Sequence, residues 1–138
     1  MPGSYLIDEP RSLVFSQGWG VLTDDEILAH VRTLRGDARF QPAFQQVIDF
    51  RRLSEIKLST TGIRAVAERN PFAADAHRAI VVSSDEAFGL ARMYASYTEI
   101  PDSPIRIYRS LAPALEWVGL DATTEWPAQA PHATFDFS

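Results

Sequence analysis

The stretch VIDFRRLSEIKLSTTGIRAV, residues 47–66, decides the fold of this chain of 138 residues. At its start, Val47 and Ile48 place apolar side chains on both faces of an extended backbone. Strands of this kind lie in the middle of a sheet that helices cover on both faces. We therefore expect a central strand near residues 45–50, followed by a loop at 51–57.

The second half of this stretch has the pattern of a helix that begins at hydroxyl side chains. Ile63, Val66 and Ala67 share one face of such a helix. Every helix leaves its first backbone N–H groups without a partner, and a hydroxyl at the N-cap accepts a hydrogen bond from one of them. We expect Ser59 or Thr60 to be this cap.

Alternation and helical spacing predict the elements on either side of this stretch. Two helices open with the pattern of a capping box, Thr23 with Glu26 and Ser83 with Glu86. The predicted strands lie near 4–10, 12–20, 45–50, 78–84 and 104–110, and the predicted helices near 23–35, 59–70, 84–98 and 110–119.

The order of these elements is β-β-α-β-α-β-α-β-α, which predicts an α/β fold with a single mixed β-sheet of about five strands and about four helices. Strands separated by one helix favour parallel neighbours, whereas the opening hairpin is antiparallel. The length indicates one domain, which we assign to residues 1–120. Residues 121–138 have no periodicity and are expected to form an extended tail, with Trp126, Phe135 and Phe137 as its candidate docking residues.

Composition narrows the classes of function. Apolar residues make up 46% of the chain and charged residues 22%, as in ordinary globular proteins. The net charge is −5 and the basic residues are scattered, so nucleic acid is not an expected partner. The chain has no cysteine, which excludes disulfides and thiol catalysis. No apolar run approaches the ~20 residues of a membrane span, and MPGSYLIDEP lacks the basic region and long apolar stretch of a signal peptide. We therefore expect a cytoplasmic protein without stable membrane insertion.

The sequence contains no recognisable catalytic or metal-binding constellation. His30, His77 and His132 lack the spacing of metal ligands. The acidic run 24–26 falls in the first turn of a helix, where the helix dipole already stabilises negative charge. We expect no metal, no cofactor and no enzymatic activity, with an enzyme of unrecognised site as a third alternative.

Arg51 and Arg52 follow the predicted central strand directly. Open α/β sheets bind ligands at the carboxyl ends of their strands, so these two side chains are candidate anion contacts. The alternative is a solvated loop with charged tips.

The predicted helix 84–98 carries an apolar stripe, formed by Leu90, Met93, Tyr94 and Tyr97. Met adapts its shape and Tyr has a polar end, so the stripe is a candidate wall of an apolar pocket. The alternative is core packing, which any helix on a sheet requires.

The element order, VIDFRRL, the hydroxyl and glycine residues at the helix start, and AIVVSSDEAFGLARMY together resemble the STAS domain. The resemblance covers residues 4–120 and is closest to the SpoIIAA-like bacterial branch of that family. WGVLTDDEI and FGLARMY are its most distinctive phrases.

The resemblance implies two functions, neither of them enzymatic. In anti-sigma-factor antagonists of the family, a hydroxyl at this helix start is phosphorylated by a partner kinase, and the matching positions here are Asp49, Ser59, Thr60, Thr61 and Gly62, with Thr61 as the modified hydroxyl. The family's aspartate before the hydroxyls corresponds here to Leu58 or Thr60. The SpoIIAA-like branch is also similar to CRAL-TRIO lipid-exchange domains, which implies binding of an apolar small molecule.

We therefore expect a non-enzymatic regulatory or protein-interaction domain with its binding surface around 58–64. The alternative is a carrier or sensor of a hydrophobic, lipid-like molecule held between helix 84–98 and the sheet. The expected partner is accordingly another protein or a hydrophobic small molecule, and a homodimer is left open. At 59–61, helix capping is favoured over phosphorylation, because capping alone explains the hydroxyls.

Overall fold

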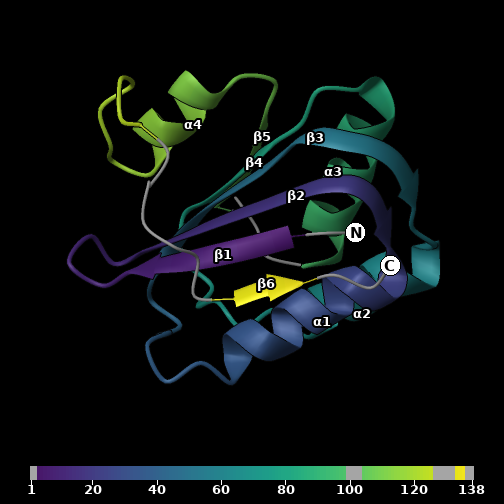
Figure 1. Cartoon of the computed structure of the whole chain (residues 1–138), viewed down its shortest axis with the longest axis horizontal. Coiled ribbons are helices and arrows are strands. Elements are labelled where there is room, and N and C mark those ends of the chain that lie inside the picture. The colour runs from purple at the N-terminus through teal and green to yellow at the C-terminus, as the bar shows by residue number, and fades with distance from the viewer. Residues whose placement is uncertain (1–2, 99–103, 126–132, 136–138) are drawn as a thin grey trace.

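The computed structural model describes residues 3–98, 104–125 and 133–135. They form one mixed sheet with the strand order β5-β4-β3-β2-β1-β6 and four helices (Figure 1). In chain order the elements are β1 (Gly3–Asp8), β2 (Leu13–Thr23), α1 (Asp24–Arg35), β3 (Gln45–Lys57), α2 (Thr60–Glu68), β4 (Arg78–Val81), α3 (Asp85–Tyr97), β5 (Ile105–Tyr108), α4 (Leu111–Trp117) and β6 (Ala133–Phe135). The predicted α/β class, the mixed sheet and the order of its first nine elements are confirmed.

The strands pair as the hairpin and the helical crossovers predict. β1 and β2 are antiparallel, whereas the pairs β2–β3, β3–β4 and β4–β5 are parallel. The sixth strand, β6, comes from the predicted tail and pairs antiparallel with β1, so that Phe135 lies opposite Gly3. Trp126 and Phe137 lie outside the described residues.

The prediction of a loop at 51–57 was wrong, because β3 continues to Lys57. It stays paired with β2 from Leu13↔Gln45 to Thr23↔Lys57, with two irregularities in register. Gly20 takes up one of them with a φ of 73°, which a glycine adopts without steric cost. Residues 51–57 are mostly polar because most of their side chains are exposed to solvent. Their backbone nevertheless stays paired with β2, so the strand continues.

The helices cover the two faces of the sheet unequally. α1, α2 and α3 lie on one face, where Ile48, Ile80 and Ile105 join the core, and α4 lies on the other (Figure 1). Residues of the α4 face include Phe15, Val47 and Val81, which pack with residues of α4. Because successive side chains of a strand alternate between faces, Asp49 lies on the α4 face with Val47.

Side-chain caps begin three of the helices. Thr23 accepts a hydrogen bond from the Glu26 amide and caps α1 as predicted. The cap of α3 is Ser84, which accepts from the Ala87 amide at 3.0 Å, so the prediction of Ser83 was wrong by one residue. The Ser83 hydroxyl instead donates to the Arg51 carbonyl at 3.2 Å. β4 ends at Val81, so both serines lie beyond the strand and not within it as predicted.

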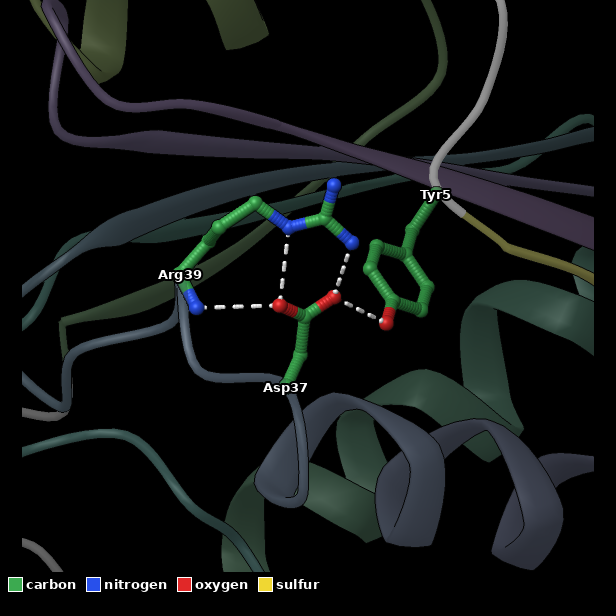
Figure 2. Close-up of polar contacts among 3 residues, drawn as sticks. All are labelled: Tyr5, Asp37 and Arg39. Carbon is green, nitrogen blue, oxygen red and sulfur yellow. Dashed lines mark hydrogen bonds and ion pairs between the residues drawn. The ribbon is translucent and has the colours of Figure 1, made fainter.

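A buried tyrosine anchors the connection between α1 and β3 (Figure 2). The Tyr5 hydroxyl donates to Asp37 Oδ2 at 2.7 Å, and the Arg39 guanidinium donates to both Asp37 oxygens at 2.9 and 2.8 Å. Hydrogen bonding from Arg39 holds the pKa of Asp37 well below its usual range. Burial is the main cause that raises the pKa of Tyr5, and the hydrogen bond to Asp37 is the second. The carboxylate therefore fixes this connection to β1.

Candidate functional site

A cavity of about 100 Å³ lies between the sheet and the three helices α1, α2 and α3. Its floor is made by apolar side chains of β3 and β4, including Ile48, Phe50 and Ile80. Val31 of α1 and Ile63 of α2 contribute to its walls. Apolar surroundings of this kind are the usual lining of a site for a small organic molecule.

The helix α3 covers the cavity and is the least buried of the three. Within α3, all of which the structure describes, Ala87 is the only buried residue, whereas α1 and α2 each bury at least four. Of the predicted stripe, Leu90 and Tyr94 line the cavity, together with Ala91. Met93 and Tyr97 do not; they are half-buried, and the Arg64 guanidinium lies 5.0 Å from the Tyr97 ring.

Polar side chains gather at one end of the cavity, where Arg78 lies at the start of β4. The Arg78 guanidinium donates to Gln46 Oε1 from Nε and Nη2, at 3.2 and 3.1 Å. Its Nη1 donates to Asn70 Oδ1 at 3.2 Å and to the Tyr94 hydroxyl at 2.8 Å. The cluster therefore connects β3, β4, α3 and the end of α2.

His30 of α1 also lines the cavity and joins this cluster through Ser16. Its Nε2 lies 3.1 Å from the Ser16 hydroxyl, which also accepts a hydrogen bond from Gln46 Nε2 at 3.1 Å. Burial first, and the charge of Arg78 second, lower the pKa of His30 to about 4. His30 is therefore neutral near pH 7, and Arg78 is positive.

Sequence reasoning missed this polar end of the cavity. Arg78 precedes the apolar run AIVV, and a charged residue at the start of a strand that is buried on both faces was a usable signal. The spacing of His30 argues against a metal ligand and assigns this side chain no other role. No pattern in the sequence connects it with Gln46 or Arg78, because these residues are far apart along the chain.

The start of α2 is a second candidate site. Ser59 is the N-cap, and its hydroxyl accepts from the Gly62 amide at 2.9 Å. The Asp24 carboxylate accepts hydrogen bonds from the Ser59 amide at 3.0 Å and from the Ser59 hydroxyl at 2.6 Å. A Cβ on Gly62 would collide with this carboxylate. The beginnings of α1 and α2 are therefore joined through Asp24, an aspartate from a distant part of the sequence.

Of the other residues in this predicted group, Asp49 alone lies away from the start of α2. Thr60 and Thr61 are exposed beside Ser59. Asp49 lies on the opposite, α4 face of the sheet, where it is buried and bound by both nitrogens of the Arg51 fork, at 3.0 and 2.9 Å. Leu58, which precedes the cap, lines the cavity.

The two candidate anion contacts lie inside β3 and not in a loop. Arg51 is engaged by Asp49 in a bidentate ion pair. The Arg52 guanidinium lies 5.6 Å from the centre of the Trp19 ring, within range of a cation–π contact. Both side chains therefore have partners from the sheet itself.

The histidines are dispersed, and the described part of the chain holds no cluster of three or more potential metal-ligating side chains. His77 stacks on Trp117 at 4.1 Å between ring centres, and His132 lies outside the described residues. Among the described residues, no helix is both long and apolar enough to cross a membrane.

Comparison of the chain with protein-family models, curated proteins and solved structures gave no match. The resemblance to the STAS domain therefore remains a prediction from the sequence.

Proposed function

We propose that this protein binds a small, largely apolar molecule in the cavity beneath α3, as a carrier or sensor. The observation that carries the proposal is the cavity itself, which has an apolar floor and walls and a polar cluster at one end. A few polar groups in an apolar pocket are the usual means of orienting a ligand.

The volume of the cavity indicates how such a ligand enters. At about 100 Å³ it is smaller than the ~150 Å³ apolar cavity that accommodates benzene in other proteins. A longer molecule requires outward movement of one wall. α3 is suited to that movement because Ala87 is its only buried residue, and its other core contacts, such as Phe88 and Ala91, are partly exposed.

Titration with the neutral fluorescent probe N-phenyl-1-naphthylamine tests the proposal. We expect saturable binding that Ala91→Leu weakens at least tenfold, because the larger side chain enters the cavity. Ala65→Leu is the matched control, since Ala65 is a half-buried residue of α2 that does not line the cavity. Saturable binding that is equally strong in both variants would place the probe elsewhere and overturn the proposal.

A regulatory or protein-interaction role for the surface at 58–64 is a second candidate. It is supported by the exposed Thr60 and Thr61 and by Leu58 and Ile63, which line the cavity. A ligand that displaces these two apolar side chains would alter the adjacent surface, which is the property of a sensor.

Phosphorylation of this surface is tested by mass spectrometry of protein isolated from its own host. The Ser59 hydroxyl already donates to Asp24 and accepts from Gly62, so we expect it to act as a cap and to carry no phosphate. Substantial phosphate on Thr60 or Thr61 would instead support a switch of the antagonist type.

A further inference from the structure

Arg78 is a buried cation without an anionic partner in the described part of the chain. Arg78 is only 8% exposed, and its guanidinium donates hydrogen bonds to the neutral oxygens of Gln46, Asn70 and Tyr94. No ion pair of the described residues includes it. The guanidinium also lies 4.5 Å from the Phe72 ring centre and 5.4 Å from that of Tyr94.

A buried charge in such surroundings is costly. Neutral acceptors and aromatic rings recover part of the hydration energy that a guanidinium loses on burial, and a carboxylate recovers more because it adds an opposite charge and accepts two hydrogen bonds. Core arginines are usually paired for this reason. An anion beside Arg78 would therefore be stabilised by the charge of the guanidinium and by its one N–H, on Nη2, that makes none of these hydrogen bonds.

The position of Arg78 relative to the cavity defines what kind of anion fits. Among the described residues that line the cavity, Arg78 is the only one with a formal charge at neutral pH. Ile80 follows on the same strand, Val82 comes directly after the strand, and both also line the cavity. At ~3.3 Å per residue, the distance from Arg78 to Val82 is about 13 Å. A ligand with its anionic group at Arg78 would therefore extend an apolar chain along this floor.

Building on the proposed function, we infer that the ligand is an amphipathic monocarboxylate, with its carboxylate bound by Arg78 and its hydrocarbon chain in the apolar part of the cavity. Tyr94 is placed to assist, because its hydroxyl already contacts Arg78 and it belongs to the helix that covers the cavity. A carboxylate at this point would connect the floor of the cavity to its cover.

A purely structural role for Arg78 is the competing explanation. The same hydrogen bonds tie β4 to β3, to the end of α2 and to α3, and these contacts do not require a ligand. The two explanations differ in one respect, because only the ligand-binding role requires a preference for an anionic over a neutral amphiphile.

Calorimetry with octanoate and octanol distinguishes the explanations, since the two molecules share a chain and differ in the head group. We expect wild-type protein to bind octanoate at least tenfold more tightly than octanol. Arg78→Met should abolish this preference while retaining binding of octanol. Arg106→Met is the control, because Arg106 is exposed on the α4 face and stacks on Trp117.

A second measurement keeps the test decisive if Arg78→Met does not fold. In NMR spectra of octanoate labelled at its carboxyl carbon, the pKa of the bound carboxylate should lie below that of the free acid, because the guanidinium favours the charged form. Equal binding of octanoate and octanol would overturn the inference and leave the proposed function intact. Failure of wild-type protein to bind either amphiphile or the neutral probe would overturn both.

Discussion

Gly62→Ala tests whether Asp24 locks the start of α2. The added Cβ would occupy the position of the Asp24 carboxylate. That carboxylate accepts hydrogen bonds from the Ser59 amide at 3.0 Å and the Ser59 hydroxyl at 2.6 Å, so both bonds are lost when it moves away. The substitution therefore breaks the contact between the beginnings of α1 and α2 without changing either Asp24 or Ser59.

The expected loss follows from two opposing effects. Each exposed hydrogen bond contributes about 0.5–1.5 kcal/mol, so losing two costs about 2 kcal/mol. Replacing Gly by Ala within a helix recovers up to about 1 kcal/mol. We expect the free energy of unfolding to fall by about 1 kcal/mol.

Gly89→Ala is the matched control. Gly89 is an exposed residue of α3, and a Cβ built on it has no atom within 4 Å. With no contact to break, the same substitution should stabilise the protein by about 0.5–1 kcal/mol. The two variants should thus differ by nearly 2 kcal/mol, in opposite directions from wild type.

Urea unfolding followed by circular dichroism measures these changes. The Gly62 substitution should be repeated in an Asp24→Ala background, where the collision is absent and the alanine should be neutral or stabilising. The reasoning is refuted if Gly62→Ala stabilises wild-type protein as much as Gly89→Ala does.

Three further predictions concern the cavity and the two buried polar clusters. Ala91→Leu should raise the free energy of unfolding, measured in urea, by about 1 kcal/mol. Up to three added carbons enter the cavity at ~0.8 kcal/mol each, and the loss of side-chain entropy offsets part of this gain. A loss of stability above about 1 kcal/mol would mean that the space is already filled. The pKa of His30 is lowered from 6.5 to about 4 in the folded protein. Between these two pH values the unfolded chain binds a proton and the folded chain does not, so stability falls as the pH falls, by about 3 kcal/mol in all. His30→Gln should flatten this part of the stability–pH profile, and an unchanged profile would show that His30 is not buried in its neutral form. Tyr5→Phe should cost about 1–2 kcal/mol in thermal or urea unfolding, because a buried hydroxyl bonded to Asp37 is lost while Asp37 keeps its contact with the Arg39 guanidinium; an unchanged stability would contradict a role for this hydroxyl in fixing the connection.

Local patterns in the sequence determined the elements and their order. The two apolar faces around Val47 and Ile48 predicted a central strand, and β3 occupies that position in the sheet. Thr23 was the predicted cap of α1 and Ser59 one of the two predicted caps of α2, and both are caps. These predictions succeeded because strand alternation, helical spacing and N-capping depend on residues within a few positions of one another.

Boundaries depended on neighbours that the sequence does not identify. Residues 51–57 have the polarity of a loop, yet they extend β3 because the second half of β2 lies beside them and completes their hydrogen bonds. Ser83 and Ser84 are both followed by residues suited to a helix start, and only the path of the chain decided that Ser84 is the cap. Contacts with neighbouring elements, rather than local propensity, therefore set the end of β3 and the start of α3.

The candidate sites were decided by tertiary structure. Asp24 and Ser59 are 35 positions apart in the sequence, and Gln46 and Arg78 are 32 positions apart, yet each pair is hydrogen-bonded. The sequence by itself could place Leu90 and Tyr94 on one helical face, but not tell whether that face would meet a filled core or a cavity. Whether Arg78 has a carboxylate beside it was equally undetermined, because the charges around a buried side chain are set by all the elements that the fold packs against it.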